Sequence, residues 1–466
     1  MLYVQAGDLP GSDLNKGVLV TAAISWAWIR QAATASITAL MVALVAACSA
    51  DFPSRSDAGD GSTVDVLSTP DTALEEGGVD LVKVPVEDAS EAGNVVKQTS
   101  ALGLGILSSL HGKTVVTSPA STVVALSMLA SGAEGETEDE FAVILGASGE
   151  ARNQAVNALV AALDPYRVAP ADIDLDSLPD HPQIHMASQV VADDDLNINP
   201  VYVHSLEKWF DAGILETDLQ APGAKKILND WVRENTAGLI KESGLDITED
   251  TVLALQNAIV LAAAWTHPFE PYATAPEQFH RLDGTDVEVD FMNGTFHVPY
   301  SETGEWKMVE LPYGDDGSLV ARYVIGPEEV AVSSLDAPVL DTLEMSLSEQ
   351  TVFVSIPKLD LTSTASLVDP LQRQGLTSVF SGAPNALSHI SDARDLIVDQ
   401  VVQQGRFKVD EAGTVAAAIT EVGIDTASAV SPEQEFVADR PQIIIIKDKT
   451  TGWDLFQVLV NDPTGA

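Results

Sequence analysis

From about Asn94 to the C-terminus, the chain keeps one uninterrupted globular pattern, with no internal repeat and no second linker. Helical patterns come early in this stretch and strand patterns come late, which indicates a single α+β domain over residues 94–466. The apolar run 253–264 fits either a helix or a strand, because its periodicity is not resolved. We expect helices at 118–129, 138–145 and 224–243, and strands at 306–312, 319–325, 352–357, 442–446 and 455–460.

The composition limits both the forces that hold this domain together and the partners that it can bind. The apolar fraction of 45% is enough for a large core. Cys48 is the single cysteine, so no intramolecular disulfide and no cysteine zinc site can form. The net charge of −45 argues against nucleic acid and against an anionic membrane surface as partners, and we interpret it as an adaptation for solubility.

The N-terminal residues look like an export signal. An uncharged apolar run at 31–47 follows Arg30, and residues 45–48 (Val-Ala-Ala-Cys) resemble the lipobox of bacterial lipoproteins. That resemblance implies a lipid on Cys48 and an exported protein that is lipid-anchored at the cell envelope or extracellular; a plain signal peptide or membrane anchor with an incidental cysteine is the alternative. We assign residues 1–48 to this signal region, with 1–29 suggesting a start assigned too early, and 49–93 to an acidic flexible linker.

The sequence carries no motif for an enzyme. A glycine-rich phosphate loop and a G-x-S-x-G turn are both missing. The acidic run that begins at Asp172 resembles the start of a calcium loop, but Ser177 and Gln183 occupy the positions that require glycine and glutamate. The run 193–195 (Asp-Asp-Asp) is typical of a solvated turn. We therefore expect no catalytic activity, no metal and no cofactor.

The stretch 411–428 (EAGTVAAAITEVGIDTAS) is unusual in suiting both a strand and an exposed loop. Read as a strand, it places threonine, alanine, valine and isoleucine on the even positions 414–424 and both of its later carboxylates on the odd face. The even face could therefore be buried in a sheet. Its glycines and flanking turn formers are equally typical of a loop.

Ten segments, taken in order, resemble the serpin family of serine protease inhibitors over residues 95–463. Each motif is short, but the ordered set is specific. The stretch 411–428 resembles the hinge and reactive-centre loop of that family. The other segments are 117–121, 125–129, 132–137, 229–238, 257–265, 310–313, 356–358, 436–441 and 455–463.

This resemblance implies an α+β fold with N-terminal helices, large mixed and antiparallel sheets and an exposed reactive-centre loop. In serpins a protease cleaves the loop and stays attached as an acyl-enzyme, while the loop inserts into the large sheet as a new strand. The resemblance thus implies a monomeric inhibitor rather than an enzyme. Small, uncharged residues on the inward face at 414, 416 and 418 favour an inhibitory member, because a buried charge would slow insertion.

The resemblance also implies roles for individual residues. Counting along the loop places the cleaved bond at Ala427–Ser428, with Thr426–Ala427 or a neighbouring bond as the alternative. The methyl side chain of Ala427 suits elastase-like or subtilisin-like proteases. The residues of the hinge would be Glu411, Gly413, Thr414, Val415, Ala416, Ala417, Ala418 and Thr420.

A buried polar cluster beneath the insertion site is implied as well. It would contain Ser118, Ser121, Asn257 and Gln403, with Trp265 where the loop first enters. Gln403 replaces the histidine usual in the family, but its amide can still donate and accept. Gln457, directly after Leu455-Phe456, likewise replaces a glycine that is usual in the family.

Three rival functions remain at this level. The first is a serpin-fold binding or storage protein that is cleaved without trapping, which the hinge composition disfavours. The second is a structural or adhesive surface lipoprotein, and the third is a hydrolase, disfavoured by the missing motifs.

Overall fold

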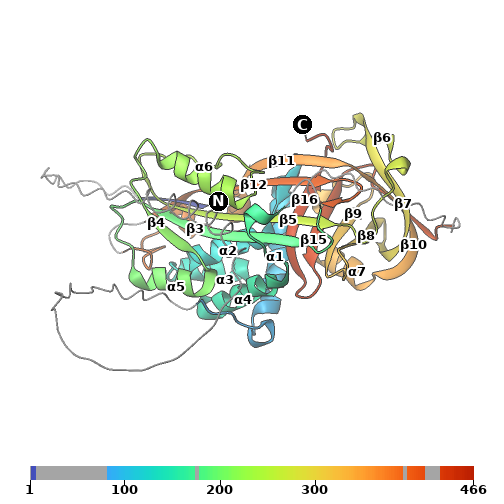
Figure 1. Ribbon diagram of the computed structural model, residues 1–466. Helices are drawn as coiled ribbons and strands as arrows, with labels where there is room; N and C mark the ends of the chain where they lie inside the picture. Colours follow the sequence, from blue (N-terminus) through green and yellow to red (C-terminus); the bar gives the residue numbers. More distant parts are fainter. Residues whose placement is uncertain (1, 7–80, 174–177, 392–395, 415–430, 466) are drawn as a thin grey trace, which may run out of the picture. The chain divides into compact units, whose positions relative to one another are not determined.

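The computed structural model describes residues 2–6, 81–173, 178–391, 396–414 and 431–465. Residues 1–7 and 79–466 belong to one compact unit, and the second unit, 8–78, lies outside the described residues. The first unit combines a seven-stranded sheet and a nine-stranded sheet with helices (Figure 1). This arrangement confirms the predicted α+β fold.

The seven-stranded sheet has the order β1-β12-β13-β5-β3-β4, and β11 pairs with β12. Strand β5 is buried along almost its whole length, and the undecided run 253–264 is therefore a strand, as the resemblance implied. Strands β5 and β12 run parallel, because β1 and β13 are antiparallel to both. The bounds are β1 Leu2–Ala6, β3 Gln183–Ala192, β4 Gly213–Glu216, β5 Thr251–Ala264, β11 Leu359–Ser366, β12 Leu396–Val409 and β13 Gly413–Thr414.

The nine-stranded sheet has the order β14-β10-β7-β8-β9-β15-β16-β2, and β6 pairs with β7. Its five sequence-predicted strands are all present, and β9 has the predicted bounds. The bounds are β2 Val115–Thr117, β6 Ala275–His280, β7 Asp286–Thr303, β8 Trp306–Tyr313, β9 Leu319–Ile325, β10 Ser348–Pro357, β14 Gln434–Val437, β15 Gln442–Asp448 and β16 Trp453–Val460.

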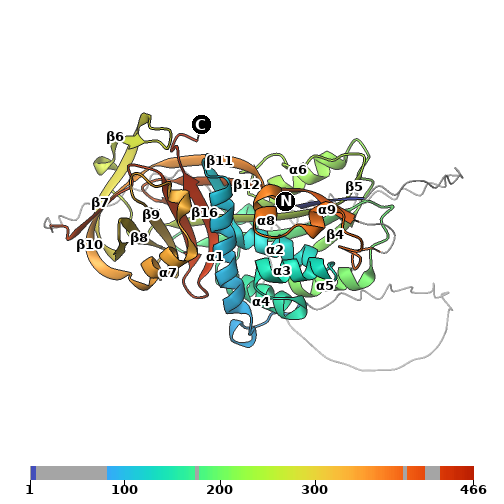
Figure 2. The same cartoon turned by 180° about the vertical axis from the view of Figure 1, so that it is seen from behind.

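The helices pack on the two sheets, and α1 contacts β16 on the side seen in Figure 2. None of the helices in the described ranges is both long and apolar enough to cross a bilayer. The α-helices are α1 Ala92–Ser109, α2 Pro119–Ala130, α3 Glu136–Leu145, α4 Gly149–Ala162, α5 Pro200–Phe210, α6 Ala224–Asn235, α7 Ala337–Met345, α8 Val368–Arg373 and α9 Ser378–Ser381. Short 3₁₀ turns lie at η2 Val86–Asp88, η3 Asp164–Tyr166, η4 Pro170–Asp172, η5 Pro271–Ala273 and η6 Val332–Ser334.

Helix α2 lies at the centre of the molecule, and all of its residues are buried. Its start follows from the sequence, because Pro119 occupies the first turn and the Ser118 hydroxyl accepts a hydrogen bond from the Ser121 amide. A helix without a polar face can exist only between other layers. Helix α2 therefore forms a buried floor against β5 and β16.

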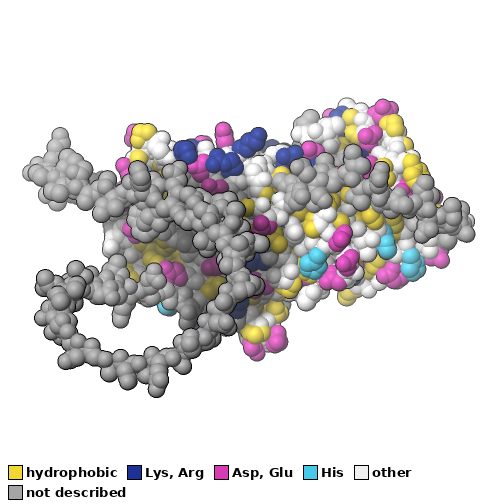
Figure 3. All heavy atoms as spheres, viewed as in Figure 1, with side chains coloured by type: hydrophobic (Ala, Val, Ile, Leu, Met, Phe, Trp, Pro, Cys, Tyr) yellow, Lys and Arg dark blue, Asp and Glu magenta, His cyan; other side chains and the backbone are white. Residues whose placement is uncertain are grey.

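Helix α6 ends at Asn235, so the prediction of one helix over 224–243 is wrong in its second half. The chain turns because Ala237 and Gly238 have φ values of 48° and 77°, and the Gly238 amide donates to the Arg233 carbonyl over 2.9 Å. Lys and Arg side chains gather along the upper edge of Figure 3, over α6. On helix α6, Lys226 and Arg233 form ion pairs with Asp230.

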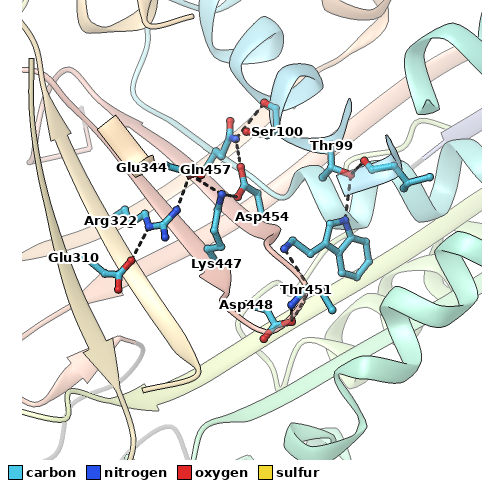
Figure 4. Close-up of polar contacts among 12 residues, drawn as sticks. Thr99, Ser100, Glu310, Arg322, Glu344, Lys447, Asp448, Thr451, Asp454 and Gln457 are labelled. Atoms are coloured by element: carbon cyan, nitrogen blue, oxygen red, sulfur yellow. Dashed lines mark hydrogen bonds and ion pairs between the residues drawn. The ribbon is translucent and has the colours of Figure 1, made fainter. Parts of the chain in front are cut away.

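A buried network of ion pairs joins strands of the nine-stranded sheet to each other and to α7 (Figure 4). Arg322 pairs with Glu310 over 2.8 Å and with Glu344 over 2.6 Å. Lys447 pairs with Asp454 over 3.1 Å and with Glu344 over 2.6 Å. Burial alone would lower the pKa of Lys447, but Asp454 and Glu344 outweigh it and the pKa is raised.

Gln457, which stands where the resemblance implies a glycine, is accommodated by a glycine in helix α1. Its side-chain amide donates to the Asp454 carboxylate over 2.8 Å and to the Ser100 carbonyl over 3.3 Å (Figure 4). A Cβ at Gly103 of α1 would lie only 2.3 Å from the Gln457 side-chain oxygen. Gly103 therefore leaves the space that Gln457 fills.

Candidate functional site at the strand slot

The predicted hinge begins as a tight turn that leads from β12 into the two-residue strand β13. Asp410 and Gly413 exchange two backbone hydrogen bonds of 3.0 and 3.2 Å, and the Asp410 carboxylate accepts from the Ala412 amide over 3.0 Å. Strand β13 then enters the sheet between β12 and β5, where Gly413 lies opposite Ala264 and Thr414 opposite Ala263. The first two residues after the turn are thus already strand residues.

The close approach of β13 to the backbone of β5 requires a glycine at position 413. A Cβ at position 413 would lie 2.2 Å from the Ala263 carbonyl oxygen and 2.8 Å from the Ala264 Cα. Both are backbone atoms of the neighbouring strand and cannot move aside as a side chain can. Thr414, which follows, is 1% exposed.

Glu411 connects the turn to two neighbouring segments of the chain, between β10 and β11 and between η5 and β6. Its carboxylate forms an ion pair with Lys358 over 2.7 Å and accepts from the Thr274 hydroxyl over 2.7 Å. Burial alone would raise the pKa of Glu411, but these two bonds outweigh it and the pKa is lowered. The Glu411 carbonyl also accepts from the Phe269 amide over 2.9 Å.

Trp265 and Tyr313 form an aromatic support directly beside the hinge. Their rings stack with centroids 4.4 Å apart and an angle of 10° between the planes. The Trp265 indole donates to the Asp410 carbonyl over 3.1 Å, and the Tyr313 hydroxyl forms a hydrogen bond with the Thr414 hydroxyl. Burial raises the pKa of Tyr313, so it remains a neutral phenol.

The polar cluster predicted beneath the insertion site is buried, and it is arranged as two separate sets of bonds. The Ser121 hydroxyl donates to the Asn257 side-chain oxygen, and the Asn257 amide donates to Ser188 over 2.8 Å. The Gln403 amide instead donates to the Ser118 carbonyl over 2.9 Å and to the Thr122 hydroxyl over 3.2 Å. A direct bond between Gln403 and Asn257 does not occur in this arrangement.

The side-chain oxygen of Gln403 is buried and has no hydrogen-bond partner among the described residues. It borders a cavity of about 50 Å³ between β5 and β12. Residues of β5, β12 and α2 line this cavity, and Val232 of α6 together with Thr236, Leu239 and Ile240 covers it. Among the described residues, no strand pairs with β5 from Asn257 to Ala262 on the side of β12. We call this space, between 257–262 of β5 and 403–408 of β12, the slot.

Several predicted site residues lie outside the described residues. These are the lipidation candidate Cys48, the bond Ala427–Ser428, and Val415, Ala416, Ala417, Ala418 and Thr420 of the hinge. The described site residues Glu411, Gly413, Thr414 and Trp265 lie together at one end of the slot, and Ser118, Ser121, Asn257 and Gln403 lie at its other end.

Sequence reasoning missed the partners of the hinge. Lys358, Thr274 and Tyr313 are far from Glu411 and Thr414 in the chain, and no spacing rule joins them. Lys358 and Tyr313 did occur in the ordered motifs at 356–358 and 310–313. Such a motif supports the family resemblance, but it does not show which residues its members contact in the fold.

Comparison with known proteins agrees with this geometry. The sequence model of the family described as "Serpin (serine protease inhibitor)" matches residues 98–463. The chain is 30% identical to Serpin-Z7 of Hordeum vulgare over 363 residues, which are 75% of this chain and 90% of that protein. It is 29% identical to plasminogen activator inhibitor 1 of Neovison vison, over 68% of this chain and 83% of that protein.

A solved structure shows the same fold. The thermophilic serpin tengpin in its native state superposes with a TM-score of 0.69 at 22% identity, covering 79% of this chain and 94% of that one. The hinge entering the sheet, the slot beyond it and the match over residues 98–463 together lead to one assignment. The chain belongs to the serpin family of serine protease inhibitors.

Proposed function

We propose that this serpin inhibits serine proteases as a suicide substrate, with its cleaved loop inserting into the slot. The observation that carries the proposal is strand β13, which already begins the insertion above an unfilled cavity. Glu411 and Trp265 hold the start of the loop at the mouth of the slot. A loop fixed at this point needs only to continue along the same line.

The register of β13 defines where each later residue would go. Thr414 lies opposite Ala263 of β5 and Val409 of β12. Because the new strand is antiparallel to both, each step forward in the loop is one step backward in both neighbours. Six steps bring Thr420 opposite Asn257 (263 − 6) and Gln403 (409 − 6). Thr420 shares the parity of Thr414, so it belongs to the inward face.

This register gives the unpaired oxygen of Gln403 a donor. The Thr420 hydroxyl would arrive over the polar cluster and could donate to that oxygen. A buried acceptor without a partner costs about 1–3 kcal/mol, and insertion would remove that cost. The substitution of histidine by Gln403 is therefore compatible with trapping.

In the chemical step, the protease serine attacks the carbonyl carbon of Ala427. The bond to the Ser428 nitrogen breaks, the amine leaves with a proton, and an ester joins Ala427 to the protease. Insertion then competes with hydrolysis of this ester. The methyl side chain of Ala427 fits the small specificity pockets of elastase-like and subtilisin-like enzymes.

We further propose that the serpin domain (94–466) follows an acidic linker (49–93) and a signal region (1–48), and that a lipid on Cys48 holds the monomeric protein at a bacterial cell envelope. The apolar run before the single cysteine supports this anchor. Palmitate labelling of the chain and of Cys48→Ser would test it, because only the former should incorporate label.

Incubation with elastase and with subtilisin, followed by denaturing electrophoresis, tests the trap. The proposal predicts a covalent complex that survives SDS and disappears when the protease serine is first blocked. Cleavage without any complex would identify a serpin that is only a substrate, and the trap would be rejected. Edman sequencing of the released C-terminal peptide should begin at Ser428.

A further inference from the structure

The far end of the insertion line, beyond the slot, is occupied by the chain's own N-terminus. Strand β1 (Leu2–Ala6) lies between β5 and β12, antiparallel to both, beside the N label in Figure 1. Leu2 lies opposite Leu255 of β5 and Val401 of β12, and Tyr3 lies opposite Ala254 and Gln400. Strand β1 therefore makes the backbone pairings of a central strand at this end of the sheet.

The positions of β1 coincide with those that the loop needs. Continuing the register of β13, eight steps from Thr414 lead to Leu255 (263 − 8) and Val401 (409 − 8), which are the partners of Leu2. Loop residue 422 would therefore take the position of Leu2, and residue 423 that of Tyr3. The opposing residues of β5 and β12 cannot pair with both strands at once.

The two segments also match in pattern at these positions. Leu2 and Val4 correspond to Val422 and Ile424 on β5, so apolar residues fall on the same parity in both segments. The slot between β13 and β1 has room for the loop up to Glu421, whereas cleavage at Ala427 frees six more residues for insertion. With β1 in place, insertion would stop before it is complete.

We propose that 253–255 of β5 and 396–401 of β12 form a binding site for the chain's own N-terminal strand, and that β1 competes there with the cleaved loop. This inference rests on the proposed trap. An inhibitor whose insertion stops early releases the protease by ester hydrolysis and behaves as a substrate. Removal of residues 1–47 by hydrolysis of the peptide bond before Cys48 would detach β1 and open the full path.

The test compares two full-length variants in a Cys48→Ser background, which prevents lipoprotein processing. Val4→Pro places a residue without an amide hydrogen in the middle of β1 and breaks its pairing, whereas Val4→Ile keeps it. Each variant is mixed with elastase or subtilisin, and the ratio of SDS-stable complex to cleaved serpin is measured. We expect Val4→Pro to raise this ratio at least fivefold over Val4→Ile.

A synthetic peptide, acetyl-Leu-Tyr-Val-Gln-Ala-amide, serves as the added competitor. When it is supplied in excess to Val4→Pro, the ratio should fall back toward that of Val4→Ile. Equal ratios for the two variants, or no effect of the peptide, would overturn the competition. If neither variant forms any complex, both the trap and the competition are rejected.

A cross-link detects the strand itself, whatever the protease assay gives. Gln5 lies opposite Ile397 of β12, so Gln5→Cys with Ile397→Cys should form a disulfide on mild oxidation in the same background. The control pair is Gln5→Cys with Lys408→Cys. Gln5 lies beside the start of β12, whereas Lys408 lies at its other end, so this pair should stay reduced. Failure of the first pair to oxidise, or equal oxidation of both pairs, would overturn the binding site.

Discussion

The slot of the seven-stranded sheet and the ion-paired core of the nine-stranded sheet are built in opposite ways. The slot contains a cavity of about 50 Å³ and a buried oxygen of Gln403 without a partner among the described residues. The core contains β15, buried at every residue, and the linked charges of Arg322, Glu344 and Lys447 (Figure 4). One region is left open between two strands, and the other is tied together by linked ion pairs.

The difference indicates that the two regions have different roles: the core keeps one arrangement, and the slot can accept a strand. Buried ion pairs are costly to break because each partner left behind is an uncompensated charge. They therefore hold β9, β15, β16 and α7 in a single arrangement. Among the described residues, no ion pair joins β5 to β12 across the slot. Helix α2 is buried against β5, so a strand can enter the slot without breaking the ion pairs of the core. Four substitutions test this contrast.

The largest effect is expected in the core. Lys447→Met removes the cation between Asp454, which is 0% exposed, and Glu344. Urea unfolding of the intact chain should show a loss of about 3–5 kcal/mol. Lys449→Met is the matched control, because Lys449 is half exposed and its partner Glu310 keeps Arg322; its loss should stay below about 1 kcal/mol. Equal losses would contradict a specially rigid core.

The next effect is expected at the mouth of the slot. Thr414→Arg places a charge on the inward face and removes the hydroxyl bonded to Tyr313. The rate of insertion should fall on the order of a hundredfold, about 2.7 kcal/mol, and SDS-stable complex should give way to cleaved serpin. Thr414→Ser retains the hydroxyl and should trap normally. Unchanged trapping by the arginine variant would show that a charge at the mouth of the slot does not hinder insertion.

A smaller effect is expected at the far end of the slot, opposite Asn257 and Gln403. Thr420→Val removes the hydroxyl that we assign to the oxygen of Gln403, with little change in size. The cleaved form should lose about 1–2 kcal/mol relative to the wild type, and the intact form should be unaffected. Thr420→Ser keeps a hydroxyl and should retain the stability of the wild-type cleaved form. A valine variant whose cleaved form unfolds like the wild type would refute the register from which Thr420 was assigned.

The smallest effect is expected from the ion pair of Glu411 with Lys358. A lowered carboxyl pKa contributes stability above the unfolded-state pKa, and this contribution is lost as the pH falls through the folded-state pKa. The difference in unfolding midpoint between wild type and Glu411→Gln should therefore be constant from about pH 8 to pH 5 and shrink at lower pH, as the pH falls through the folded-state pKa. A difference that grows in acid would have the wrong sign.

The sequence predicted the fold class and most elements, because apolar periodicity and the ordered motifs are local signals. Prediction from the sequence failed where tertiary contacts determine the structure. Helix α6 stops at Asn235 because of a left-handed turn that the periodicity of 224–243 does not reveal. The fit of Gln457 depends on Gly103, more than 300 residues away in the chain. The pairing of β1 with β5 and β12 was not predicted, since a segment's own residues do not show which strands it will pair with.

Amide hydrogen exchange before and after cleavage of the loop tests the central claim most directly. We predict that exchange slows strongly at 257–262 of β5 and 403–408 of β12 once the loop is cut, because a new strand pairs with both. Exchange within β15 and β16 should not change. If the amides along the slot exchange equally fast in the intact and cleaved proteins, no strand has entered and the proposed trap is wrong.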